Sequence, residues 1–226
     1  MFQAIVDFMY KIVEKLHDLI VSVGVTDVGV SYVLAVILFT FLVRLILLPL
    51  NIKSTRSTEK MQQLQPEVKK LQAKHKNSPE KLNQEMMQLY KENNVSMTGG
   101  CLPMVIQMPI LFALYWAFRK INLGSDASFL WISNLAARDP YFILPVLAAG
   151  STYISTVFST KATSVNTEGS PVNMATMNVG MSIMIGVSAI NFESLLVIYW
   201  IAGSLIQMLQ TYVIVILPRK NKAKKA

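Results

Sequence analysis

Charged residues are scarce in this chain of 226 residues. Asp, Glu, Lys and Arg make up 15% of it, whereas about a quarter is usual in a soluble domain. Hydrophobic residues make up 53%, and the mean hydropathy is +0.43. This composition excludes an ordinary soluble domain and indicates a protein whose helices lie within a membrane.

Cysteine and histidine are also rare. The single cysteine, Cys101, excludes an internal disulfide, and the two histidines, His17 and His75, lie too far apart in sequence for a metal-binding motif. The chain has no Walker loop, no glycine-rich nucleotide fingerprint and no motif that pairs a nucleophile with a base. We therefore expect no metal, no cofactor and no enzymatic activity.

The chain has instead several long stretches without charge. Each can supply the roughly 20 residues that a helix needs to cross about 30 Å of hydrocarbon. The stretches are 28–52, interrupted by Arg44 alone, and 93–118, 140–160, 169–192 and 194–218. We predict an all-α polytopic membrane protein with five transmembrane helices, the first at 28–52 and the other four within 96–218.

Lysine and arginine are distributed unevenly between the connections. With Arg44 set aside, the segment 53–92, Lys161 and the tail carry fifteen of them. The N-terminal segment and the connection 119–139 carry five. Because positive residues accumulate on the cytoplasmic side of a membrane, we predict an outside N-terminus and a cytoplasmic C-terminus.

Three segments lie outside these spans. In residues 1–24, apolar residues recur at helical spacing opposite a charged face, which predicts a helix on the membrane surface or, as the alternative, against a soluble partner. Residues 53–95 show two helical arms around a turn at 76–79 and predict a cytoplasmic helical hairpin, with Pro66 kinking or starting part of its first arm. The basic tail, 219–226, can bind anionic lipid or a polyanion.

Arg44 is the most informative residue of the first span. The other membrane-length stretches contain no acidic residue, so water or dipoles must stabilise its charge. We predict a hydrated groove around Arg44 that opens to the cytoplasm. Its expected lining is Arg44, Thr40, Gln107, Ser155, Trp200, Ser204 and Gln207. Two alternatives stay open, because Arg44 can snorkel to the interface and spaced hydroxyls can simply join transmembrane helices.

Several short motifs resemble those of a known family. They are Val43-Arg-Leu-Ile-Leu-Leu-Pro, Met61-Gln-Gln-Leu-Gln-Pro-Glu, Leu89-Tyr-Lys-Glu, Gly100-Cys-Leu-Pro, Gln107-Met-Pro and Ala113-Leu-Tyr. In order, spacing and residue type they resemble the YidC family of membrane protein insertases, in the five-span form of Gram-positive bacteria. The resemblance extends from about Ser31 to the C-terminus.

The resemblance implies an insertase in the bacterial cell membrane that needs no nucleotide hydrolysis. A client's polar segment would enter the groove, attracted by Arg44, while its apolar segment moves into lipid. Methionine adapts to varied apolar partners, so we expect Met181, Met184 and Tyr199 to form a client slide, with ordinary apolar packing as the alternative. The implied partners are nascent membrane proteins, the ribosome, the Sec translocon and membrane lipids, with no small-molecule substrate.

Two other classes of function stay open from the residues alone. A small-anion channel or transporter could use Arg44 as its anion site, although the five unequal stretches show no inverted repeat. A passive assembly scaffold would depend on the hairpin and on the methionine-rich span, and Arg44 would be dispensable. Solute flux and client insertion, each measured in liposomes, distinguish the three functions.

Overall fold

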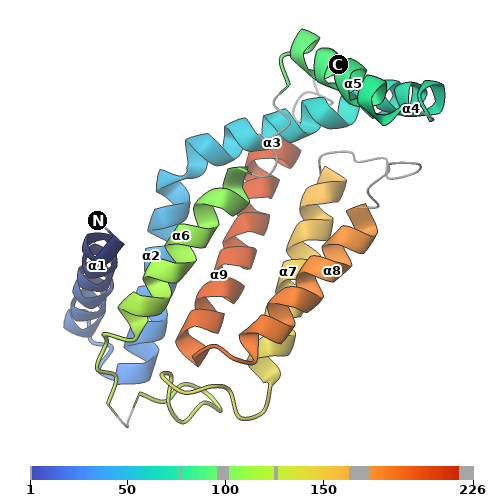
Figure 1. The fold of residues 1–226 in the computed structure, drawn as a ribbon. Coiled ribbons are helices and arrows are strands. Elements are labelled where there is room, and N and C mark those ends of the chain that lie inside the picture. The colour runs from blue at the N-terminus through green and yellow to red at the C-terminus, as the bar shows by residue number, and fades with distance from the viewer. Residues whose placement is uncertain (1, 77, 96–101, 125–126, 163–173, 219–226) are drawn as a thin grey trace.

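The computed structural model describes residues 2–76, 78–95, 102–124, 127–162 and 174–218 (Figure 1). Cys101, the basic tail at 219–226 and part of the turn expected at 76–79 lie outside these ranges. All named elements within them are helical, which confirms the all-α prediction. They are α1 (Phe2–Ser22), α2 (Val28–Ile46), α3 (Leu48–Gln63), α4 (Gln65–Lys74), α5 (Pro79–Glu92), α6 (Leu102–Phe118), α7 (Ile143–Ala162), α8 (Met174–Ala189), α9 (Ser194–Thr211) and the π-helical turn η1 (Tyr212–Ile216).

Helices α2, α6, α7, α8 and α9 form a bundle (Figure 1). Helix α9 packs against α2 and α7, and α8 packs along α7. Gly186 of α8 lies close to α7, where an added Cβ would be 2.9 Å from the Cβ of Ala149. Helices α3, α4 and α5 lie beyond one end of this bundle, which we call the hairpin end (Figure 1).

Three helices are long and apolar enough to cross a membrane, namely α2, α7, and α9 together with η1. Helix α6 has 17 residues, and the apolar part of α8, Thr176–Ala189, is also shorter than the other three. The count of five spans therefore stays a prediction for α6 and α8.

The first span ends earlier than we predicted. Helix α2 ends at Ile46, and α3 begins at Leu48 and continues to Gln63, so residues 48–52 belong to the next helix. Pro49 explains the break, because it lacks an N–H to continue the ladder and its ring clashes with the preceding turn. Arg44 is thereby placed in the last turn of α2.

Helix α1 packs on α2 and α6. Val6 and Val13 are fully buried in these contacts. The ring of His17 stacks on Tyr32 of α2 with centroids 3.9 Å apart, and the Tyr32 hydroxyl donates to Oε1 of Glu14 at 3.0 Å. Part of the expected apolar face therefore contacts the bundle, and the location of α1 at a membrane surface stays a prediction.

Helices α4 and α5 form the predicted hairpin. Pro66 lies in the first turn of α4, as the sequence suggested. A small apolar cluster joins the two arms, and its buried members are Leu64, Val68, Tyr90 and Val95. Near the turn, Lys74 and His75 both contact the carboxylate of Glu85, at 3.2 and 2.9 Å. The hairpin therefore has its own core, separate from that of the bundle.

The connection between α6 and α7 covers the other end of the bundle. Its Ile132 and Leu135 are buried in the main core. The backbone N–H groups of Ser194 and Leu195, at the start of α9, donate to the carbonyls of Ala137 and Leu135 at 2.8 and 3.1 Å. The connection thus satisfies donors that the first turn of a helix leaves unpaired, and it packs this end of the bundle tightly.

Candidate functional site

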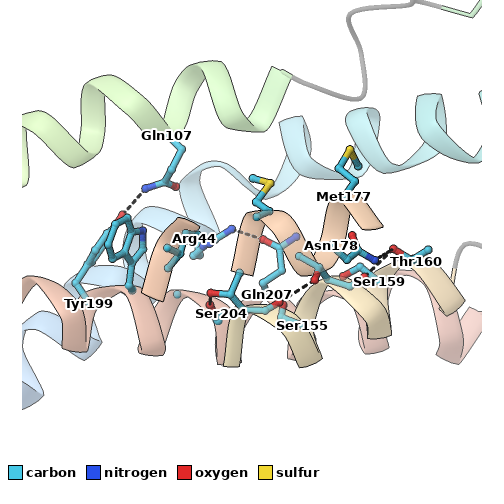
Figure 2. A pocket seen from close by; sticks show the side chains of 16 residues that line it. Arg44, Gln107, Ser155, Ser159, Thr160, Met177, Asn178, Tyr199, Ser204 and Gln207 are labelled. Atoms are coloured by element: carbon cyan, nitrogen blue, oxygen red, sulfur yellow. Dashed lines mark hydrogen bonds between the residues drawn. The ribbon is translucent and has the colours of Figure 1, made fainter. Parts of the chain in front are cut away.

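A cavity of about 340 Å³ lies among the five helices of the bundle (Figure 2). Its walls come from the last turn of α2, from Gln107 in the first half of α6, from the second half of α7 and from the facing parts of α8 and α9. Because α2 and α7 run toward the hairpin end and α6 starts there, these segments lie in the half of the bundle nearest that end (Figure 1). The cavity and the tightly packed connection are therefore at opposite ends.

Arg44 projects into this cavity from α2 (Figure 2). Its Nη1 donates to Oε1 of Gln207 at 2.5 Å. Its Nη2 lies close to the backbone of α9, where a Cβ added to Gly203 would be 3.4 Å away. Within the described part of the chain, no carboxylate forms an ion pair with Arg44. The bond to Gln207 occupies one of the five guanidinium N–H donors, which leaves donors for water or a bound polar group.

Aromatic residues of α9 form the side of the cavity farthest from the hairpin end. Tyr199 is 5% exposed, and its hydroxyl accepts a hydrogen bond from Nε2 of Gln107 at 2.8 Å (Figure 2). Trp200 also lines the cavity, and its ring meets Phe192 edge to face at 5.7 Å. The packed rings hold this wall in a fixed geometry.

Helix α7 contributes a wall of hydroxyl groups. They belong to Thr152, Ser155, Thr156, Ser159 and Thr160. The Thr152 and Ser204 hydroxyls lie 3.4 Å apart, and those of Ser159 and Thr211 lie 3.2 Å apart. The same hydroxyl face therefore lines the cavity and joins α7 to α9. Both roles considered for these spaced hydroxyls, lining a groove and joining transmembrane helices, apply together.

Eight of the ten predicted site residues line the cavity. They are Arg44, Gln107, Ser155, Met181, Tyr199, Trp200, Ser204 and Gln207. Thr40 does not, because its hydroxyl is buried and donates to the carbonyl of Val36, one turn back in its own helix, at 2.6 Å. Met184 is 54% exposed and lies outside the lining. Tyr199, expected on an apolar slide, is instead buried beside the polar groups of the cavity.

Eight further residues line the cavity and were not among the predicted site residues. Asn178 and Gly203 are the two of these that matter most for the polar groups. Asn178 of α8 is 7% exposed and donates from Nδ2 to the Thr160 hydroxyl at 3.2 Å. In sequence it lies among the methionines of the fourth apolar stretch, and this polar residue in an apolar span was an available signal. Gly203 had no such signal, because only the packing of α2 on α9 places it against a guanidinium.

The cavity combines a largely apolar surface with a few polar groups. It offers one cation together with amides and hydroxyls, which can bind a carboxylate or another polar group away from bulk water. Among the described residues, no group of three or more His, Cys, Asp or Glu side chains could hold a metal ion.

A family model described as 60Kd inner membrane protein matches residues 24–222. The membrane protein insertase YidC of Clostridium perfringens (strain 13 / Type A) is 53% identical over 223 residues, which cover 98% of this chain and 94% of that protein. The chain belongs to the YidC family of membrane protein insertases. The family suggested by the sequence motifs is thus confirmed, and the chain is a bacterial membrane protein.

Other YidC proteins agree with this assignment. The insertase MisCA of Bacillus subtilis (strain 168) is 41% identical over 207 residues, covering 90% of this chain and 77% of MisCA. The crystal structure of an active YidC insertase with its first transmembrane domain resolved is similar with a TM-score of 0.69 and 27% identity. That similarity covers 91% of this chain and 46% of the larger protein, so this chain spans about half of its length.

Proposed function

We propose that this YidC-family protein inserts client membrane proteins by holding a client's polar segment in the cavity around Arg44. The observation that carries the proposal is a half-buried guanidinium in a cavity of about 340 Å³, with no carboxylate partner among the described residues. A cation in such a place is costly unless water or a ligand completes its environment. The volume accommodates on the order of ten water molecules at about 30 Å³ each.

The polar lining lowers the barrier that a client's polar segment meets in the membrane. Gln207, Ser155 and Ser204 can solvate such a segment, and Arg44 attracts a carboxylate more strongly there than in bulk water. The client's apolar segment then moves out between the helices into lipid. Met181 lines the cavity, and exposed Met184 on the next turn of α8 continues from it, so these two are the residues that we retain for an apolar slide.

The insertion step needs no nucleotide. Each Leu, Ile, Phe or Val of a client span contributes about −0.3 to −0.6 kcal/mol at the bilayer centre, so a full span supplies the free energy itself. The protein has only to lower the kinetic barrier for the polar segment. The client thus supplies the free energy and the protein lowers the barrier, and polar groups in a cavity are enough for that role.

The proposed orientation places the hairpin end in the cytoplasm. The segment 53–92 carries nine Lys and Arg residues, and such segments stay on the cytoplasmic side. The cavity lies near that end, whereas the connection from α6 to α7 packs the outer end. Clients would therefore arrive from the cytoplasm, where the basic hairpin and tail face the ribosome, the Sec translocon and anionic lipid as proposed partners.

The direct test is insertion of a single-span client with a short acidic N-terminal tail into liposomes that contain the purified protein. Protease protection of the tail reports insertion. We expect insertion with the wild type and with Arg44→Lys, and a loss of about tenfold or more with Arg44→Ala, since a buried charge contact of 1.4 kcal/mol gives that factor. Full insertion with Arg44→Ala would remove Arg44 from the mechanism.

The same liposomes test the small-anion transporter. A transporter predicts saturable anion flux that depends on Arg44, whereas an insertase predicts insertion without such flux. A scaffold predicts neither flux nor insertion by the protein alone.

A further inference from the structure

Arg44 lies where its helix ends. Carbonyls in the last turn of an α-helix have no donor within that helix, and one buried without another partner is costly. Helix α2 ends at Ile46, so the carbonyl of Arg44 belongs to this group. It accepts a hydrogen bond from Nε2 of Gln210 in α9, at 3.0 Å. A side chain of another helix thus satisfies the backbone of the residue that carries the charge of the cavity.

Three residues on one face of α9 contact Arg44. Gly203, Gln207 and Gln210 follow one another at steps of four and three, so they lie on the same side of the helix. Gly203 leaves room for Nη2, Gln207 accepts from Nη1 at 2.5 Å, and Gln210 donates to the backbone carbonyl. We call these three residues the Arg44 seat.

We propose that Gln210 is a positioning residue for Arg44. Gln210 does not line the cavity, so it has no direct contact with a client held there. Its bond fixes the backbone from which the guanidinium projects, at the one point where Pro49 interrupts the helix. This role rests on the proposed function and adds to it a residue that sets the direction in which the Arg44 side chain projects.

The alternative positions of Arg44 explain why such a residue is needed. An arginine has a long stem with several rotatable bonds, and one near a helix end can snorkel toward the interface. If the last turn of α2 moves, the pairing of Nη1 with Gln207 is lost and the guanidinium can point out of the cavity. A bond to the main chain restrains the turn itself, which the bond from the guanidinium to Gln207 does not.

The first test compares two clients that differ only in an acidic or a neutral polar tail. In the proteoliposome assay we compare wild type, Arg44→Ala, Gln210→Met and Leu209→Met. Methionine matches the length of glutamine without an N–H donor, and Leu209 is a neighbour that is 56% exposed. We expect Gln210→Met to lower the ratio of acidic to neutral insertion about fivefold, as loss of one hydrogen bond would, with Leu209→Met unchanged.

Two results of this test would overturn the inference. An unchanged ratio in Gln210→Met, when Arg44→Ala lowers it, would show that Arg44 needs no help from Gln210. An equal loss for both clients would show a general structural role, because general destabilisation does not discriminate between charges.

The second test does not depend on insertion. Hydrogen exchange of the backbone amides at 45–48, 50 and 51 reports the junction of α2 and α3 directly, since Pro49 has no N–H. We expect these amides to exchange faster in Gln210→Met than in the wild type, and the exchange rates in the rest of α2 to stay the same. Unchanged rates at the junction would overturn the inference. If Arg44→Ala leaves the ratio of acidic to neutral client insertion unaltered, the proposed function is wrong, whatever the role of Gln210. The exchange rates then decide separately whether Gln210 holds this junction.

Discussion

At the scale of single residues, Gly203 is the glycine that lets the backbone of α9 lie beside the guanidinium of Arg44. A methyl group there would lie 3.4 Å from Nη2 of Arg44 and 3.9 Å from the Thr40 methyl. Gly203→Ala should therefore fill the space beside Nη2 and restrict the positions in which the guanidinium can bond to Gln207. We expect insertion of an acidic client to slow by about threefold, equivalent to under 1 kcal/mol.

Gly180→Ala is the matched control for this prediction. Gly180 lies on α8 with nothing within 4 Å of an added Cβ, and alanine favours a helix by about 1 kcal/mol over glycine. Its insertion rate should equal that of the wild type. Equal slowing in both variants would mean that helix propensity, and not contact with Arg44, decides the outcome.

The sequence indicated which polar residues lie in the spans better than it indicated which way their side chains point. Arg44 and Gln207 were identified because polar groups in apolar spans are few and expensive. Thr40 does not line the cavity, and spacing alone cannot tell whether a hydroxyl faces a cavity or, as here, donates to its own helix at Val36. Gly203 was missed for a related reason, since the importance of an absent side chain depends on a partner helix.

At the scale of elements, the connection from α6 to α7 depends on a close contact with α2. A Cβ added to Gly29 would lie 1.7 Å from the carbonyl oxygen of Ser128. Gly29→Ala must therefore push this connection away from the start of α2, and we expect destabilisation of about 1–3 kcal/mol or more. Thermal unfolding in detergent and protease cleavage within 127–142 measure the effect.

Gly150→Ala provides the comparison, because Gly150 is also helical and has open space around it. It should keep the unfolding temperature and the cleavage rate of the wild type. Equal behaviour of the two variants would contradict the close packing of the connection on α2.

Glu193, which precedes α9 at the same end of the bundle, should make the thermal stability of the protein depend on pH. Burial raises the pKa of its carboxyl group, and Arg119, whose Nε lies 3.3 Å from Oε1, opposes that rise. A carboxyl whose pKa is raised on folding stabilises the fold below its unfolded pKa, and this stability is lost as the pH rises through the folded pKa. Thermal stability should therefore fall through this group as the pH rises above about 4, the usual pKa of a glutamate.

Glu193→Gln should remove this part of the pH profile. Glu80→Gln, a change on the exposed face of α5, should leave the profile of the wild type in place. An unaltered profile in Glu193→Gln would show that other groups govern the pH dependence.

The elements themselves could largely be predicted, and their ends less so. Helical spacing and turn residues predicted the hairpin, and Pro66 marked the start of α4. The first span was drawn too long because hydrophobicity continues through Ile52 while the backbone breaks at Pro49. A transfer scale measures the cost of side chains in lipid and does not include the missing N–H of a proline.

At the scale of the whole molecule, the bundle has one packed end and one end with a polar cavity. The packed end contains the buried residues of the connection and of the start of α9, and the cavity lies toward the basic hairpin. This asymmetry is what a protein needs if it accepts polar segments from one side while it limits leakage to the other. The sequence predicted it only through charge distribution and Arg44, because the closing contacts are long-range.

The central claim is that a client's polar segment occupies the cavity around Arg44, and disulfide cross-linking tests it most directly. In a Cys101→Ser background, single cysteines replace Ser155, which lines the cavity, or Ile154, its 56% exposed neighbour on α7. The client carries one cysteine in its acidic tail. We predict tail cross-links from position 155, reduced by Arg44→Ala, and few from position 154. Equal cross-linking from both positions, or none from 155 during active insertion, would contradict the account.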